Sequence, residues 1–463
     1  MGIVVLLGVA PRVCGGRARC PARRRSEHPA RRGGAVNTPP RLLFLGSTLP
    51  YPPDSGQAIR SFHVLRLLAR AFDVTALCFY RRTPLSFGRP EGGTIEQDLA
   101  QRLAALSQLA DVAAFPIPQE HNIWRLVWDH LRSVSRNEVY TTFALDSRTF
   151  RKRLLHLLRT RRFDVVHMDS ITLSGYLPLL GDLPIVCVHH NIESALLERR
   201  GRAEKSLWRR AYLLHQARLM EREMRHWCGR CRLNVMVSEA DRMELQRIVP
   251  EANSAVVPNG VDIDAFRPGV GREDSIVFVG GLNWFPNRDA LQYFCDAILP
   301  IMRAAGEPAP ARWLGGGASD EVRRHYGDRY GVELTGYVPD VRPYVRDAAC
   351  YIVPLRVGGG TRLKILDAWA MGKAVVSTSV GCEGLAAEDG QNILIRDDPD
   401  GFAHAVRAVL HDGALRQRLG IEGRSTVERL YSWEGIGESM LPLYRSLHDS
   451  RKDERSNIPL QNA

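Results

Sequence analysis

One pattern occurs twice along this chain: a short apolar run, a loop rich in glycine or proline, and a segment with helical periodicity. The first copy consists of Arg41–Gly46 (RLLFLG), the loop Leu49–Gln57 and the helical pattern Ile59–Arg70, and the apolar run Phe72–Cys78 follows it. This order predicts a βαβ unit, whose parallel strands are buried on both faces. Further apolar runs of the same kind are Phe163–His167, Pro184–His189 and Asn234–Ser238, the last with Ser238 as a helix cap.

A second series begins after the turn-rich stretch Val257–Pro268 (VPNGVDIDAFRP), which has no apolar periodicity and is predicted to be a linker. Beyond it, Ser275–Gly280 predicts a strand and Asp289–Ile301 a helix. The remaining predicted strands are Ala311–Leu314, Val332–Thr335, Ala349–Pro354, Ala374–Ser377 and Asn392–Ile395, and a helix is expected over Trp433–Leu447. Strands that alternate with helices in two halves predict an α/β protein of two Rossmann-like, doubly wound domains that face each other across a cleft.

We expect an N-terminal domain over 41–257, a linker over 258–270 and a second domain over 271–432. Residues 433–448 are expected to form a helix that packs back toward the first domain, and 449–463 a polar tail. Residues 1–40 carry eight arginines against one glutamate and read as a disordered basic extension or as the result of a start codon assigned too early.

The rest of the chain keeps +5 of the formal charge of +12, which suits anionic small ligands or an acidic membrane surface. No zinc-finger spacing or RNA-binding aromatic pattern is present, so nucleic acid is not an expected partner. Cys228 and Cys231 form the one C-x-x-C pair, and no second pair at ligand spacing follows. We interpret them as unpaired cysteines in a reducing cytosol, with a zinc site or a redox dithiol as the alternative.

The most informative window is Val357–Glu383, where three glycines precede a helix that is expected to start near Thr361. A helix N-terminus offers free backbone N–H groups and positive potential, and glycine lets the backbone approach an anion closely. Arg362 and Lys364 would add positive charge beside a leaving diphosphate, and Asp367 could accept hydrogen bonds from ribose hydroxyls. A glycine-softened turn with solvated basic residues is the alternative interpretation of this window.

Asp367–Val376 (DAWAMGKAVV) resembles the donor-binding motif of the retaining glycosyltransferase family four, which has the GT-B fold. Most members carry Glu, seven residues and a second Glu before Ala-x-Ala-x-Gly-x-Pro-Val-Val. Here Asp367 stands in place of the second glutamate and Gly359 in place of the first, which in the family commonly contacts the sugar or stabilises the transition state.

Four other elements are similar to family landmarks in the same order: Pro258–Asp262 (PNGVD), Phe278–Leu282, Gly315–Gly317 and Thr335–Val341. Gly281 stands where many members have a phosphate-binding arginine, a detail that resembles a subgroup linked to exopolysaccharide biosynthesis. The resemblance spans Arg41 to Leu447.

The resemblance implies a donor nucleotide in the second domain and an acceptor that enters from the first. Gly56 matches the glycine loop of the family's first domain, and a histidine after a strand, His190 with His189 as the alternative, would lie near the transferred sugar; a structural histidine also fits. The implied catalytic residues are His190, Arg362 and Lys364, and the implied donor-binding residues are Gly56, Gly281, Gly359, Gly360, Thr361 and Asp367.

The function implied is transfer of a sugar from a nucleotide sugar to a saccharide or a lipid-linked saccharide, with retention and by a front-face mechanism. A nucleotide-sugar epimerase of the same layout and a non-catalytic nucleotide-sugar-binding subunit remain alternatives. We expect no metal and no cofactor, because Asp262-Ile263-Asp264, although a D-x-D, lies in the predicted linker and GT-B enzymes typically need no metal.

The segment Arg199–Arg225 combines an arginine-rich face with an apolar stripe. It could contact an anionic membrane that carries a lipid-linked acceptor, or it could be an exterior helix whose stripe lies in the core. We therefore expect a cytoplasmic protein, with the inner face of the membrane as an alternative location.

Overall fold

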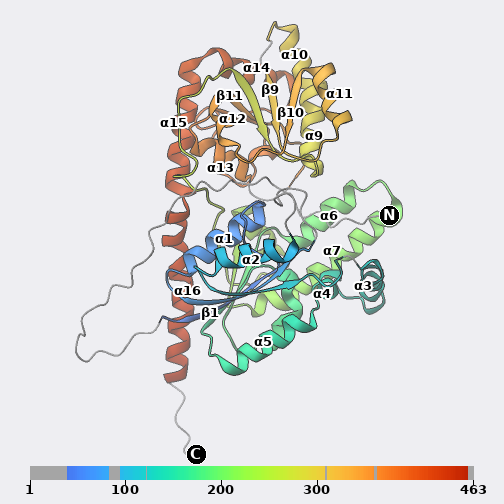
Figure 1. The fold of residues 1–463 in the computed structure, drawn as a ribbon, viewed down its shortest axis with the longest axis vertical. Helices are drawn as coiled ribbons and strands as arrows, with labels where there is room; N and C mark the ends of the chain where they lie inside the picture. Colours follow the sequence, from blue (N-terminus) through green and yellow to red (C-terminus); the bar gives the residue numbers. More distant parts are fainter. Residues whose placement is uncertain (1–38, 83–93, 121, 308–309, 359–361, 457–463) are drawn as a thin grey trace, which may run out of the picture.

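The computed structural model describes residues 39–82, 94–120, 122–307, 310–358 and 362–456, which form two parallel α/β domains (Figure 1). In the N-terminal domain the sheet order is β3-β2-β1-β4-β5-β6-β7, and every pair of neighbours is parallel. Its strands are β1 (Arg41–Gly46), β2 (Asp73–Tyr80), β3 (Asp111–Pro116), β4 (Val165–Met168), β5 (Ile185–His189), β6 (Leu233–Met236) and β7 (Ser254–Val256).

The C-terminal domain has the order β10-β9-β8-β11-β12-β13, again parallel throughout. Its strands are β8 (Ser275–Val279), β9 (Ala311–Leu314), β10 (Val332–Gly336), β11 (Ala348–Val353), β12 (Val375–Ser377) and β13 (Leu394–Ile395). Both orders reverse direction beside the first strand of the domain, as in doubly wound nucleotide-binding folds. The predicted fold class is confirmed.

Helices cover the sheets and join the strands. In the N-terminal domain they are α1 (Gly56–Leu68), α2 (Ile95–Leu106), α3 (Ile123–Arg136), α4 (Tyr140–Ala144), α5 (Arg148–Thr160), α6 (Glu193–Ala203), α7 (Leu207–Trp227) and α8 (Glu239–Ile248), with 3-10 turns η1 (Ile171–Leu179) and η2 (Cys228–Arg230). The C-terminal domain has α9 (Phe285–Tyr293), α10 (Leu299–Ala304), α11 (Asp320–Tyr330), α12 (Arg342–Asp347), α13 (Leu363–Ala370), the 3-10 turn η4 (Val380–Cys382), α14 (Pro399–His411) and α15 (Gly413–Leu430), and α16 (Trp433–Ser456) follows.

The helix predicted over Ile59–Arg70 is α1, which begins three residues earlier and ends two residues earlier, and two other helix predictions differ more from the structure. The helix expected over Asp289–Ile301 is split into α9, a π-helical turn η3 (Phe294–Ile298) and α10. Pro300 near the start of α10 has no N–H to donate to the preceding turn, which accounts for the irregularity. Helix α16 continues to Ser456, past the predicted end at Leu447. Among the described residues, no helix is both long and apolar enough to span a membrane.

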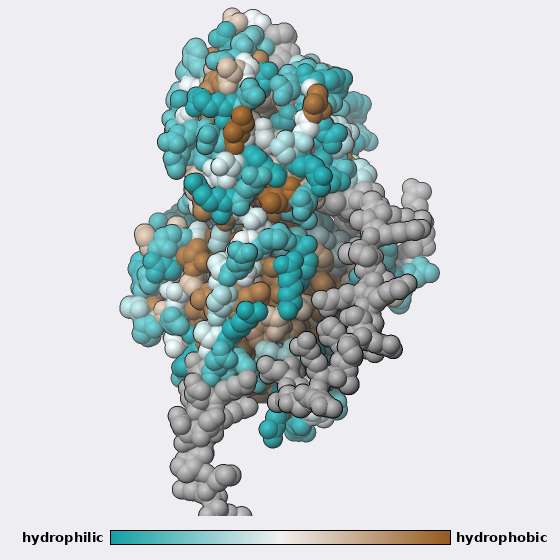
Figure 2. Space-filling model, turned by 90° about the vertical axis from the view of Figure 1, so that its left-hand side faces the viewer, coloured by the Kyte–Doolittle hydropathy of each residue, from teal (hydrophilic) through white to brown (hydrophobic). Residues whose placement is uncertain are grey.

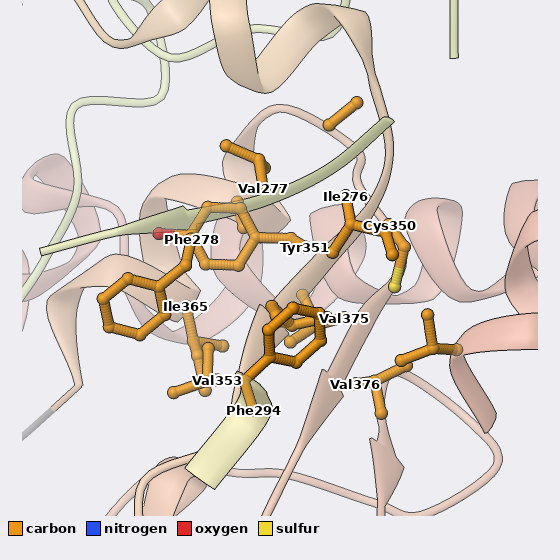
Figure 3. Close-up of a cluster of buried hydrophobic side chains, with 14 of the residues drawn as sticks. Ile276, Val277, Phe278, Phe294, Cys350, Tyr351, Val353, Ile365, Val375 and Val376 are labelled. Carbon is orange, nitrogen blue, oxygen red and sulfur yellow. The ribbon is translucent and has the colours of Figure 1, made fainter. Parts of the chain in front are cut away.

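The core of the C-terminal domain supports α13, the helix that follows the glycines of the Val357–Glu383 window (Figure 3). Phe278 of β8 stacks on Trp313 of β9 with ring centroids 3.9 Å apart. Ile365 of α13 is fully buried in the same cluster. Apolar packing therefore fixes the inner face of α13 and leaves its first turn at the sheet edge.

Helix α16 leaves the C-terminal domain and packs along the N-terminal domain. Trp433 stacks on His63 of α1 with centroids 4.6 Å apart, and the Tyr444 hydroxyl lies 2.8 Å from Nδ1 of His167. Gly437 passes so close to Leu67 that a Cβ there would come within 2.6 Å of it. In Figure 2 the molecule is narrower between the C-terminal domain, at the top, and the N-terminal domain below it.

A buried guanidinium anchors the segment that joins the domains. Arg60 of α1 donates to the carbonyls of Val257 (2.8 Å) and Pro258 (3.0 Å) and to Oδ1 of Asn259 (3.0 Å). Burial lowers the pKa of Arg60 to about 10, so it remains charged at neutral pH. The Arg60 guanidinium donates hydrogen bonds to oxygens that lose contact with water on folding and would otherwise have no donor.

We predict that Arg60→Ala lowers the free energy of unfolding by about 2–4 kcal/mol, because it leaves three buried acceptors without a donor. Denaturant or thermal unfolding measures the effect. Arg70→Ala is the matched control on the same segment: Arg70 is half-exposed and its ion pair with Glu434 is worth at most about 1 kcal/mol. Equal unfolding midpoints for the two variants would contradict the anchoring role.

Candidate functional site

The site on the N-terminal domain is built at the carboxyl ends of β4 and β5, beside the point where the strand order reverses. His190 directly follows β5, and Asp169 directly follows β4. Nε2 of His190 lies 3.4 Å from Oδ1 of Asp169. Open parallel sheets bind ligands at this edge. The structure thus pairs the predicted His190 with a carboxylate that sequence analysis did not single out.

Asp169 is almost completely buried and is held from three sides. Ser61 of α1 donates to Oδ2 at 2.6 Å, and Nε2 of His167 lies 3.4 Å from Oδ1. Burial alone would raise the pKa of Asp169, but the charge of His190 and hydrogen bonds from His167 and His190 outweigh it and hold the pKa below its usual range. Asp169 is therefore a buried anion, and its distance of 3.4 Å from His190 lets it orient the imidazole ring.

His189, the alternative to His190, points away from this carboxylate. It is buried, its Nε2 lies 3.2 Å from Oδ1 of Asn234, and burial lowers its pKa to about 4. A neutral histidine bonded to a neighbouring strand is a core residue. Between the two candidates, His190 is the one that faces Asp169.

On the C-terminal domain, Lys364 lies in the first turn of α13. Its Nζ donates to Oδ1 of Asn287 at 3.0 Å and lies 4.0 Å from the ring centroid of Phe278. Burial, with a smaller effect from the charge of Arg362, lowers the pKa of Lys364 well below its usual value. The lysine is partly desolvated, a state in which a nearby anion is strongly favoured.

Asn287 connects this lysine to the loop after β8. Its Nδ2 donates to the Gly281 carbonyl at 2.8 Å, while its Oδ1 accepts from Lys364. A Cβ at Gly280 would come within 2.7 Å of Asn287, so the close approach requires glycine there. Asn287 was not assigned a role from sequence.

Arg362 immediately precedes α13 and is buried. Its Nε and Nη2 donate to the Val380 carbonyl at 3.1 and 3.0 Å, and Nη2 lies 3.6 Å from Oε2 of Glu383. A Cβ at Gly358 would come within 3.1 Å of this guanidinium. Arg362 thus connects the glycine-rich window to η4, whereas Lys364 is the more available cation of the two.

The two domains bring the starts of two helices together. Gly56 is the first residue of α1, and a Cβ at this position would lie 3.6 Å from Cδ1 of Leu363, the first residue of α13. Both helix N-termini carry positive potential, so they favour an anion near them. Gly359, Gly360 and Thr361, the other predicted donor-binding residues, lie outside the described residues.

Residues of both domains also line a small cavity of about 60 Å³. It lies between Asn191, Arg199 and Ser238 on one side and Glu383 and Gly384 on the other. Ligand pockets are typically about 300–1,000 Å³. This cavity is therefore too small for a ligand pocket, and we interpret it as a gap in the packing between the two domains.

The remaining sequence motifs contribute to turns and to the hydrophobic core. Asp262 of the D-x-D accepts from the backbone N–H groups of Asp264 and Ala265 at 3.1 and 2.9 Å, which makes it the cap of a turn. Cys228 and Cys231 are buried free thiols. In Arg199–Arg225, Leu219, Met220 and Met224 lie in the core. The stripe of that segment thus faces inward over the second half of α7.

Comparison with known proteins defines the class. Residues 54–265 match a family model described as Glycosyltransferase Family 4, and residues 273–412 match one described as Glycosyl transferases group 1. The two matches cover most of both domains. The chain therefore belongs to the glycosyltransferases with the GT-B fold.

Curated relatives are similar over parts of the chain. The phosphatidyl-myo-inositol mannosyltransferase of Mycolicibacterium smegmatis is 27% identical over 206 residues, which cover 42% of this chain and 53% of that protein. The lipopolysaccharide core biosynthesis glycosyltransferase LpsE of Rhizobium meliloti is 33% identical over 122 residues, 25% of this chain and 34% of that protein. The chain thus spans about half or less of the length of these relatives.

Solved structures share the fold at low identity. Sucrose-phosphate synthase from Thermosynechococcus elongatus has a TM-score of 0.60 and 18% identity, and the match covers 89% of this chain and 100% of that one. Anabaena Alr3699/HepE in complex with UDP and glucose has a TM-score of 0.60 and 13% identity, with 88% and 99% covered.

We predict that Asp367 makes stability depend on pH. Burial raises the pKa of Asp367, one turn beyond Lys364 on α13, to about 7 from an ordinary 3.8. Because the pKa is higher in the folded chain, stability is greatest at low pH and decreases as the pH rises between these values. Asp367→Asn removes the decrease, so its Tm should exceed that of the wild type by about 2–4 °C at pH 8 and approach it below about pH 4.

Asp400→Asn, an exposed aspartate at the start of α14, is the control and should keep the wild-type slope. A wild-type Tm that does not fall over this pH range relative to Asp367→Asn would contradict the assignment.

Proposed function

We propose that this chain is a retaining glycosyltransferase that moves a sugar from a nucleotide sugar to a saccharide or a lipid-linked saccharide acceptor. The observation that carries the proposal is the contact between the starts of α1 and α13, with Lys364 on one side and the His190–Asp169 pair on the neighbouring domain. Helix N-termini and a desolvated lysine suit a diphosphate, and a histidine backed by a carboxylate suits the sugar and acceptor side.

In the proposed reaction the bond between the anomeric carbon and the donor phosphate oxygen breaks, and the nucleoside diphosphate leaves with the electron pair. The acceptor oxygen forms the new bond on the same face, and its proton passes to the departing phosphate. Lys364 and the α13 N-terminus stabilise the charge on the leaving group. Asp367 would accept from the ribose, and Arg362 would hold the glycine-rich window in place.

The relatives guide the choice of substrates. Anabaena Alr3699/HepE was solved with UDP and UDP-glucose, so UDP-linked sugars are the first donors to test. The similarity to LpsE and to the phosphatidyl-myo-inositol mannosyltransferase supports cell-surface glycans, including exopolysaccharide, and lipid-linked acceptors as the acceptor class. The site of action we propose is the cytoplasm, at the inner face of the membrane where such an acceptor would be exposed.

A thermal-shift screen of UDP-, GDP-, ADP- and TDP-linked sugars, followed by turnover with saccharide and lipid-linked acceptors, tests the proposal. We expect one nucleotide class to raise Tm and an acceptor-dependent release of the nucleoside diphosphate. A new epimer formed without acceptor would contradict a transferase and support an epimerase. Binding of donor without turnover across a broad acceptor panel would support a non-catalytic subunit.

We predict that Lys364→Ala lowers kcat/KM by about 100-fold, because one fixed donor of charge stabilisation at a developing anion has about this effect. Lys152→Ala, an exposed lysine of α5, is the control and should leave turnover unchanged. The Tm of both variants is measured as well, and equal values exclude a folding defect as the cause of lower turnover. Unchanged turnover in Lys364→Ala would show that the donor site lies elsewhere.

We predict that Asp169 acts through His190. Asp169→Asn should lower kcat about 10- to 100-fold with little change in KM, because the carboxylate lies beside the histidine and orients it. In a chain that already carries His190→Ala, the same change should have almost no further effect. Independent, multiplicative losses in the double variant would contradict the coupling.

A further inference from the structure

Helix α3 presents an apolar face to solvent. Figure 1 shows it at the outer side of the N-terminal domain, beyond α4 and α7. Trp124 is 81% exposed and Trp128 is 59% exposed. The exposed apolar residues are Ile123, Trp124, Val127, Trp128, Leu131 and Val134, whose spacing places them on one side of a helix. We call this set the α3 apolar face.

The polar side of the same helix is the buried one. Asp129 and Ser133 are both 0% exposed, and Nε of Arg125 donates to both Asp129 oxygens at 3.1 and 2.8 Å. Ser133 donates to the Glu138 carbonyl and accepts from Nε2 of Gln216, each at 2.7 Å. Rotation of α3 to hide its apolar face would separate Ser133 from Gln216, and Arg125 from the Phe143 and Asp146 carbonyls to which its Nη2 donates. The outward orientation is therefore fixed by the fold.

The start of α7 extends the α3 apolar face. The Tyr212 hydroxyl lies 2.5 Å from Nδ1 of His130, and one turn later Gln216 meets Ser133. The residue numbers increase along both helices from the first contact to the second, so α3 and α7 run parallel. The first turn of α7, with Trp208 62% exposed, is consequently level with the first turns of α3.

Basic residues flank this extended surface. Lys205, Arg209 and Arg210 are exposed, and the structure shows no ion pair for them among the described residues. Two acids lie close to these helices in the sequence: Glu204, which accepts from the backbone N–H of Ser206, and the exposed Glu138 after α3. The surface thus combines exposed indoles with an excess of cations.

We propose that the α3 apolar face and the start of α7 dock on an anionic lipid bilayer. Tryptophan favours the interface between headgroups and acyl chains, an amphipathic helix inserts its apolar side there, and unpaired arginine and lysine attract anionic lipid. The basic residues at its edge favour this occupant over a second copy of the chain, which would bring like charges together. The inference extends the proposed function, since a lipid-linked acceptor is presented at a bilayer.

The test is flotation of the full chain with vesicles of phosphatidylcholine alone and of phosphatidylcholine mixed with phosphatidylglycerol, without donor or acceptor. We expect binding to the mixed vesicles. Trp124→Ser with Trp128→Ser should lower it about tenfold or more, and Arg209→Glu with Arg210→Glu should lower it on the mixed vesicles by a similar factor. Ile421→Ser with Leu430→Ser, exposed apolar residues of α15, is the matched control and should bind as the wild type does.

Absence of vesicle binding by the wild type, or equal binding by the tryptophan variant and the control, would overturn the proposal. Size-exclusion chromatography without lipid separates the competing occupant: a wild-type dimer that the tryptophan variant abolishes would assign the face to a second copy. The nucleotide thermal shift of the tryptophan variant should equal that of the wild type. Loss of lipid binding with an intact nucleotide response thus separates failure of this inference from failure of the proposed function.

Discussion

The arrangement of the candidate site depends on helix α1, which contacts the interdomain segment, Asp169, α16 and the start of α13. Arg60 holds the interdomain segment, and Ser61 donates to the buried Asp169. His63 stacks under Trp433 of the returning helix α16, and Gly56 faces the start of α13. A single rigid helix thus sets the distance between the histidine side and the lysine side. Changes in α1 should therefore affect both domains together.

A buried charge is costly, and the structure keeps two of them close together. The charge of Asp169 partly offsets the effect of burial on Arg60, and histidine contacts more than offset the effect of burial on Asp169. Each charge therefore depends on fixed neighbours rather than on water. Such preorganised charges are characteristic of sites that bind or stabilise charged groups.

Much of the fold could be predicted from sequence because buried parallel strands are short apolar runs with clear ends. β1 and β9 have the predicted limits, and the other predicted strands differ by at most two residues at either end. β3 was missed because DVAAFP lacks a run of β-branched residues, and β7 because it is only three residues long. The π-helical turn depends on packing around Pro300, which periodicity does not reveal.

The candidate site was only partly predictable. Lys364 and His190 could be found because glycine-rich and strand-end motifs mark their positions. Asp169 and Asn287 could not, since their partners are far apart in the sequence and only the fold brings them together. Arg362 was expected near phosphates, but its burial under Gly358 could not be inferred from a basic residue in a loop. Helix α3 has an amphipathic pattern that would normally predict an apolar side toward the core, and the polar contacts of Asp129 and Ser133 reverse it.

The central claim is that the contact between the starts of α1 and α13 binds the diphosphate of a nucleotide sugar. A crystal structure of the chain with bound UDP tests this most directly. We expect the diphosphate at the first turn of α13, within hydrogen-bond distance of backbone N–H groups there and facing Lys364, with Gly56 opposite. A diphosphate bound away from α13, with the start of that helix facing only protein, would contradict it.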